Sequence, residues 1–105
     1  MEQPNLIYID KLSGGDNSFK EKLISVVKFE FPKEKALCFK NIEQENFKAA
    51  AENVHKLKHK IGILGLEKSY KTAVSFEENL LEKSTKGKDE FNLIIQTITN
   101  FLNTI

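Results

Sequence analysis

The sequence predicts an all-α protein, an up-down four-helix bundle with a short additional N-terminal helix. Three observations support this fold class. Apolar residues recur at helical spacing in four long segments, Pro and Gly are rare and lie where those segments should end, and no segment alternates as a strand does. The length of 105 residues suits one domain, so we assign residues 1–105 to a single unit. Amphipathic helices joined by short loops bury their apolar stripes most simply in a bundle.

The first two predicted helices lie on either side of a glycine pair. Residues 6–12 form a short apolar segment, which we expect to be the additional helix across one end of the bundle. Asp16 follows Gly14-Gly15 and can cap the next helix by accepting a hydrogen bond from a free backbone N–H group. Pro32 either kinks this second helix or begins a new one, because proline has no N–H to donate. The second stripe comprises Phe19, Leu23, Val26, Val27, Phe31, Leu37, Cys38 and Ile42.

Three further helices follow, each with one apolar stripe. The most regular stripe runs for about five turns and ends at Gly65, a residue typical of helix C-termini; it comprises Phe47, Ala50, Val54, Leu57, Ile61 and Leu64. A helix over residues 67–83 is indicated by Tyr70, Ala73, Val74, Glu77, Leu80 and Leu81. After a loop over residues 84–88, a last helix capped by Asp89 is indicated by Phe91, Ile94, Ile95, Ile98, Leu102 and Ile105.

Composition excludes several classes of protein. All 16 basic residues are Lys, the acidic residues number 15, and the net charge of +1 argues against a general nucleic-acid binder. Without Arg there is no bidentate clamp for phosphate. The single Cys excludes an internal disulfide scaffold. No apolar run approaches the roughly 18 residues of a membrane span, and residues 1–5 do not resemble a secretory signal. We expect a free-standing cytoplasmic protein.

Two histidines lie on the most regular helix. At about 100° per residue, His55 and His59 both point away from the apolar stripe, so we expect them to face outward. Three lysines, Lys56, Lys58 and Lys60, lie within five residues of His55. An exposed imidazole in a locally cationic stretch of a nearly neutral chain is therefore the main candidate for chemistry.

Three other residues continue the outward face beyond the histidines. Gly62 lies two turns after His55, although glycine in a helix interior costs about 1 kcal/mol relative to alanine. A glycine at such a position is explained by close approach of another group to the helix surface. Helical phase also places Ile63 and Leu66 outside the buried stripe, where we expect them to be exposed.

The segment from His55 to Gly65 resembles the signature of histidine-containing phosphotransfer (HPt) domains. That signature is His-x-Leu-Lys-Gly, four variable positions and then Leu-Gly, and it is matched here by His55, Leu57, Lys58, Leu64 and Gly65. The resemblance extends to residues 8–16, to Phe76-Glu77 and to Leu80, and in effect covers the chain. One position departs from the family: His59 stands where Gly is usual, which narrows the approach of a partner or adds a contact to it.

The resemblance implies a phosphocarrier that is not an enzyme by itself. His55 would accept a phosphoryl group from the Asp of a response-regulator receiver domain or from a hybrid sensor kinase, and would pass it to another receiver. Lys58, together with Lys56 and His59, would offset the phosphoryl charge. Partner docking would use the exposed residues Gly62, Ile63 and Leu66. No cofactor is expected in this chain, since Mg²⁺ belongs to the receiver; we also expect a monomer that binds neither nucleic acid nor membranes.

Two alternatives come from other classes of protein. Glu52, His55 and His59 share a helix face, and two histidines with one carboxylate can form a zinc site. Alternatively, the Lys-rich face serves a helical protein-interaction or nucleic-acid-binding module, which would show strongly salt-dependent affinity if nucleic acid were its ligand.

Overall fold

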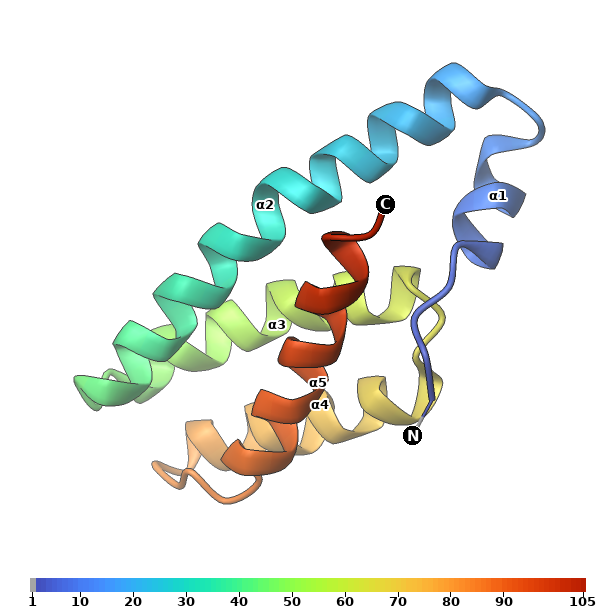
Figure 1. Ribbon diagram of the computed structural model, residues 1–105. Coiled ribbons are helices and arrows are strands. Elements are labelled where there is room, and N and C mark those ends of the chain that lie inside the picture. Colours follow the sequence, from blue (N-terminus) through green and yellow to red (C-terminus); the bar gives the residue numbers. More distant parts are fainter. Residues whose placement is uncertain (1) are drawn as a thin grey trace.

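The computed structural model describes residues 2–105, which form five helices and no strand (Figure 1). The helices are α1 (Ile7–Ser13), α2 (Asn17–Glu43), α3 (Phe47–Ile63), α4 (Glu67–Leu81) and α5 (Lys88–Leu102). The all-α prediction is therefore confirmed. None of the helices in residues 2–105 combines the length and the apolar character that a bilayer crossing would require.

Helix α2 is the longest element and runs without interruption through its proline. Asp16 caps it as expected, because its side chain accepts a hydrogen bond of 3.1 Å from the backbone N–H of Phe19. Pro32 lies inside the helix and does not begin a new one. In Figure 1 the N-terminal half of α2 extends beyond the other long helices, and α1, which precedes α2 in the chain, lies between that extended end and the rest of the molecule.

Helix α3 lies against both α2 and α4 and carries the centre of the core. Its residues Val54, Leu57 and Ile61 have no exposed surface, so the predicted stripe is confirmed. The other helices add further buried side chains to the same cluster: Phe31, Cys38, Phe76, Leu80, Phe91, Ile95 and Ile98. Burial raises the pKa of the Cys38 thiol to about 12, so this thiol stays protonated inside the core.

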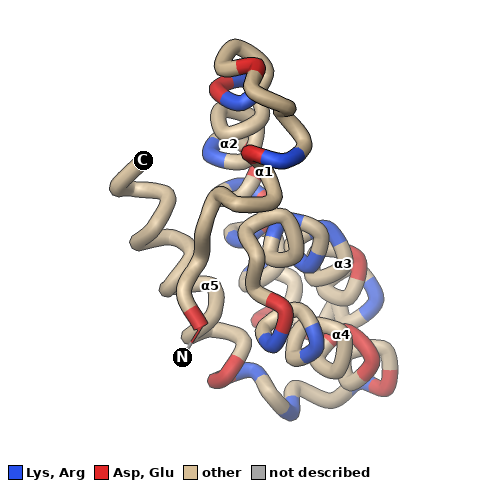
Figure 2. The backbone as a smooth tube through the Cα atoms, turned by 90° about the vertical axis from the view of Figure 1, so that its right-hand side faces the viewer, with Lys and Arg blue, Asp and Glu red and all other residues tan. Residues whose placement is uncertain are grey.

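Helix α5 differs slightly from its predicted extent and is nearly free of charge. It begins at Lys88 after Gly87, so Asp89 lies in its first turn and is not its cap, and it ends at Leu102 rather than Ile105. After Glu90 the chain has no charged residue. Figure 2 accordingly shows basic and acidic positions along α2, α3 and α4 and an uncoloured α5 beyond its first turn.

The turn between α3 and α4 is fixed by a glycine and by the N-terminal segment. Gly65 has a left-handed φ of 79°, and a Cβ atom there would lie only 2.6 Å from Nδ2 of Asn5. Asn5 also donates its backbone N–H to the carbonyl of Leu64 at 2.9 Å. The chain reverses here, and Leu66 turns into the core with 1% of its surface exposed. The expectation that Leu66 faces outward is wrong, because helical phase does not continue past the end of α3 at Ile63.

The start of α4 is capped from a distance. Its own N-cap residue, Leu66, has no side-chain acceptor, but the carboxylate of Glu2 accepts a hydrogen bond of 2.6 Å from the backbone N–H of Ser69. Burial of Glu2 acts to raise its pKa, yet the hydrogen bonds from Ser69 and Lys68 outweigh it and leave the pKa below the ordinary value of 4.5.

This cap predicts a pH-dependent contribution to stability. A carboxyl group with a lowered pKa in the folded state stabilises above its unfolded pKa, and this contribution disappears as the pH falls through the folded pKa. In urea unfolding, Glu2→Gln should therefore have a lower free energy of unfolding than wild type at neutral pH, and the difference should shrink as the pH falls below the ordinary Glu value of 4.5. Glu21→Gln on exposed α2 is the control. A difference that stayed constant over this pH range would contradict the role of the charge.

A matched pair of leucines tests the core. Leu57 is fully buried whereas Leu81 is 60% exposed. Leu57→Ala should lower the free energy of unfolding by about 2–5 kcal/mol, while Leu81→Ala should change it by no more than about 0.5 kcal/mol. Chemical denaturation of both variants gives the two values, and equal losses would show that α3 is not central to the core.

Candidate functional site

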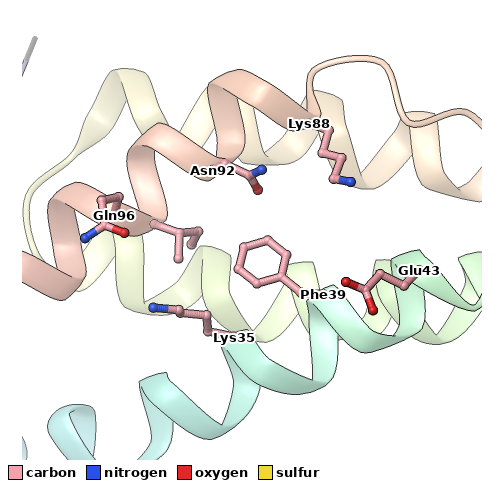
Figure 3. A pocket seen from close by; sticks show the side chains of 7 residues that line it. Lys35, Phe39, Glu43, Lys88, Asn92 and Gln96 are labelled. Carbon is pink, nitrogen blue, oxygen red and sulfur yellow. The ribbon is translucent and has the colours of Figure 1, made fainter.

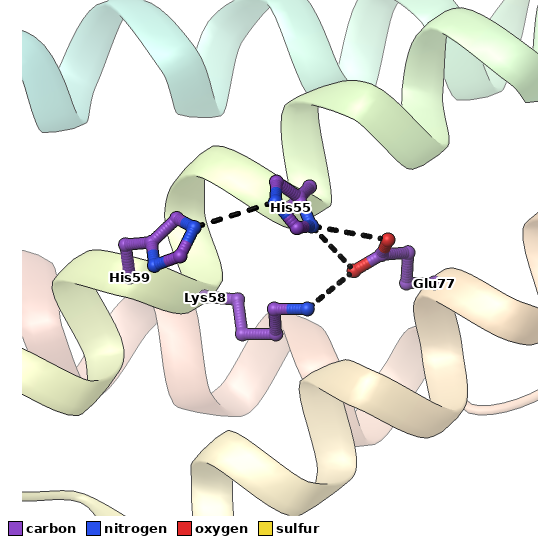
Figure 4. Close-up of polar contacts among 4 residues, drawn as sticks. All are labelled: His55, Lys58, His59 and Glu77. Carbon is purple, nitrogen blue, oxygen red and sulfur yellow. Dashed lines mark hydrogen bonds and ion pairs between the residues drawn. The ribbon is translucent and has the colours of Figure 1, made fainter.

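His55 lies on the outward face of α3, beside α4. Its buried neighbours on the helix, Val54 and Leu57, direct it away from the core, and its side chain is 52% exposed. The prediction that His55 faces outward is confirmed. The ring does not move freely in solvent, because its Nδ1 atom lies 3.2 Å from Oε2 and 3.4 Å from Oε1 of Glu77 (Figure 4).

Glu77 joins two residues of α3 from its position on α4. Besides the contact with His55, its Oε1 atom accepts a hydrogen bond of 3.0 Å from the Nζ atom of Lys58. The Glu77 side chain is 20% exposed and that of Lys58 is 12% exposed, so this ion pair is largely shielded from water. Lys58 also lies 5.8 Å from the centre of the Tyr70 ring, close enough for a cation–π contact.

The position of Glu77 in the sequence is unusual, because this charged residue occurs within an apolar helical stripe. The sequence places Glu77 in the stripe of residues 67–83 and in the resemblance at Phe76-Glu77, and neither predicts a role for it in the site. It is a carboxylate among apolar residues such as Ala73 and Leu80. A charged residue at the edge of a buried stripe needs a partner, and the partners here are His55 and Lys58.

The Glu77 contact determines which nitrogen of neutral His55 carries the proton. An ionised carboxylate only accepts hydrogen bonds, so the Nδ1 atom that faces Glu77 must be the donor. The proton of the neutral ring is then on Nδ1, and Nε2 has the free electron pair. In this tautomer, Nε2 is the ring atom that can accept a hydrogen bond or act as a nucleophile.

His59 is also exposed, as predicted, and lies against His55. The two rings meet edge to face, with centroids 4.9 Å apart and an angle of 88° between their planes. Their Nε2 atoms are 3.3 Å apart, and Figure 4 shows His59 on the side of His55 opposite Glu77. The imidazole of His55 is therefore held between Glu77 and His59.

The three lysines near His55 do not form a single cationic patch. Lys58 pairs with Glu77, as described above. Lys60 turns towards α2, where its Nζ atom lies 3.1 Å from both Glu30 and Glu34. Only Lys56 remains exposed beside His55. The cationic surroundings expected from the sequence are therefore divided between two helix interfaces and solvent.

The three residues predicted for partner docking have different environments. Gly62 is exposed, and a Cβ atom there would lie 3.3 Å from Cδ2 of Tyr70, so its small size makes room for a side chain of α4. Ile63 is half-buried against the core. Leu66 is buried, which removes it from any exposed surface.

Two hollows of similar size lie on different parts of the surface. One, of about 340 Å³, adjoins His55 between α3 and α4 and is lined by Lys48, Ala51, Glu52, His55, Lys56, Glu77 and Leu81. The other, of about 390 Å³, lies between α2 and α5, where Lys35, Phe39, Glu43 and Asn92 point into it (Figure 3). The second hollow shares no lining residue with the first, so of these two the first is the one that belongs to the candidate site.

The zinc alternative is not supported by the arrangement of side chains. Within residues 2–105, no three His, Cys, Asp or Glu side chains are placed to hold a metal ion. Glu52 therefore does not complete a ligand set with His55 and His59. The carboxylate that reaches His55 comes instead from Glu77.

Replacing Glu77 tests the tautomer of His55. Glu77→Ala removes the acceptor at Nδ1, so nitrogen NMR of the imidazoles should show a larger fraction of His55 with its proton on Nε2. Glu78→Ala, at the adjacent exposed position of α4, is the matched control and should leave the His55 signals unchanged. Equal tautomer populations in wild type and Glu77→Ala would refute the assignment.

No family model, no curated protein and no solved structure matches this chain.

Proposed function

We propose that this chain is a histidine phosphotransfer protein of a multistep phosphorelay. It carries a phosphoryl group on His55 between the Asp of a receiver domain, or a sensor kinase, and another receiver domain. The observation that carries this proposal is the contact of Glu77 with Nδ1 of an exposed His55, which leaves Nε2 as the nucleophile. In this proposal α2 to α5 are the up-down four-helix bundle of such a domain, and α1 is its additional N-terminal helix.

The transfer step follows from the tautomer. The electron pair on Nε2 of His55 attacks the phosphorus of an aspartyl phosphate, and an N–P bond forms. The P–O bond to aspartate breaks, and its electron pair leaves with the carboxylate. The proton on Nδ1 stays in place, so the phosphorylated ring becomes cationic and the adjacent Glu77 carboxylate stabilises that charge.

The lysines and the second histidine near His55 have separate roles in this proposal. Lys58 balances the charge of Glu77 and keeps the carboxylate in position, because its Nζ atom binds the same carboxylate that holds the ring. Lys56 is exposed beside the hollow next to His55 and is free to approach a phosphoryl oxygen. His59 presents a ring nitrogen on the Nε2 side of His55. Together these groups offset the added negative charge without the bidentate grip of arginine.

The receiver domain supplies the remaining chemistry. It would dock on the face of α3 that carries His55, from the hollow beside His55 to Gly62 and Ile63 at the other end of the helix, and would bring its own Mg²⁺ and acidic residues. In this proposal the chain is a cytoplasmic monomer that acts as a phosphocarrier and binds neither a cofactor nor nucleic acid. The exposed Leu81 at the rim of the hollow offers apolar surface for that contact.

Phosphoryl transfer from a receiver domain tests the proposal. After incubation with a receiver carrying labelled phosphate on its Asp, the wild type should gain an acid-labile label, and His55→Gln should gain none. His59→Gln, the same substitution one turn away, should still be labelled. Circular dichroism establishes that each variant is folded.

Two outcomes would contradict it. Equal labelling of His55→Gln and wild type would mean that His55 is not the acceptor. Salt-dependent binding of DNA or RNA by an unlabelled wild type would instead favour a nucleic-acid-binding module.

A further inference from the structure

The contact between the two histidines has a defined direction. Glu77 holds the proton of neutral His55 on Nδ1, so Nε2 of His55 can only accept a hydrogen bond. The atom facing it at 3.3 Å is Nε2 of His59. Two lone pairs at that distance would repel each other, so the attractive arrangement requires the proton on Nε2 of His59. His59 is therefore the donor, and the nucleophilic electron pair of His55 is the acceptor.

From this geometry we propose that His59 controls the reactivity of His55, an inference that rests on the proposed phosphoryl transfer. In the free protein, the N–H group of His59 occupies the electron pair that must attack phosphorus. In the phosphorylated protein, the same N–H group donates to a phosphoryl oxygen on Nε2 and helps retain the phosphoryl group. His59 is thus a positioning residue that slows both the gain and the loss of phosphate.

The surroundings of His59 allow its N–H group to move from Nε2 of His55 to a phosphoryl oxygen. Its side chain is exposed, so the ring can rotate away from His55 without leaving a cavity in the core. The N–N distance of 3.3 Å lies at the long end for a hydrogen bond, so the bond is weak enough to be broken during transfer. A neutral hydrogen bond of this kind corresponds to roughly a two- to tenfold change in rate.

Three substitutions of His59 distinguish the effect of its N–H donor from the effect of its aromatic ring. His59→Ala removes the N–H group, His59→Gln retains an N–H donor, and His59→Phe keeps an aromatic ring without one. Lys40→Ala, an exposed position on α2, is the control for unrelated surface changes. Nitrogen NMR of the free proteins measures whether Nε2 of His55 accepts a hydrogen bond, and this measurement needs no phosphoryl donor.

Phosphoramidate, a small phosphoryl donor that releases ammonia as its P–N bond breaks, provides the rates. His59→Ala and His59→Phe should gain the phosphoryl group on His55 faster than wild type and lose it faster, each by roughly two- to tenfold. Lys40→Ala should resemble wild type, and His59→Gln, which keeps an N–H donor, should react and decay at rates between those of wild type and His59→Ala. In the free proteins, the Nε2 signal of His55 should shift in His59→Ala and His59→Phe.

The inference and the proposed function fail in different ways. If wild type is labelled on His55 but all four variants react and decay at its rate, the control by His59 is overturned and the phosphocarrier stands. A proton on Nε2 of His55 in the free wild type would also overturn it. If phosphoramidate labels His55→Gln as well as wild type, the acceptor assignment itself is wrong, and the rate effect on His55 falls with it.

Discussion

The burial of one face of α3 between α2 and α4 is the constraint on which the site depends. Val54, Leu57 and Ile61 lose all their exposed surface there, and each such burial contributes about 1.5–3 kcal/mol. Because neighbouring residues of a helix point in different directions, burying Val54 forces His55 outward. Phe76 and Leu80 are buried on the side of α4 that faces α3, and their burial places Glu77, which lies between them in the sequence, beside His55. The core thus sets the geometry of a polar site that lies outside it.

The site gains its chemical character because the His55 ring is fixed at Nδ1 by Glu77, while its Nε2 atom contacts the exposed ring of His59. A single exposed histidine samples several orientations and both tautomers in water, whereas His55 is anchored at Nδ1 by a carboxylate that Lys58 also holds. The anchor is formed when the protein folds, so it need not be assembled during the reaction. In the proposed transfer, this anchor would leave Nε2 as the reacting atom and would place a negative charge beside the ring when the ring becomes cationic. The proposed phosphocarrier would also have to release the phosphoryl group, and lysine and histidine hold phosphate less rigidly than an arginine fork does.

The sequence was sufficient for features that depend on one helix and insufficient for those that depend on two. The stripe of α3 and the outward direction of His55 and His59 follow from helical periodicity, and both are confirmed. The role of Glu77 depends on where α4 crosses α3, which no local pattern specifies. The same reason explains why Lys58 and Lys60, two residues apart, pair with different helices. The prediction that Leu66 is exposed was wrong for another reason. Helical periodicity ends with α3 at Ile63, and Gly65, with its left-handed φ, turns the chain in a new direction.

The most direct test of the phosphocarrier assignment is to observe the bond itself. The nitrogen-labelled protein, phosphorylated by a receiver domain, can be examined by NMR for coupling between phosphorus and a ring nitrogen. One phosphoryl group on Nε2 of His55, with the proton retained on Nδ1 beside Glu77, is the predicted result. Phosphorus on Nδ1, on His59 or on any other residue would contradict the role assigned to the Glu77 contact.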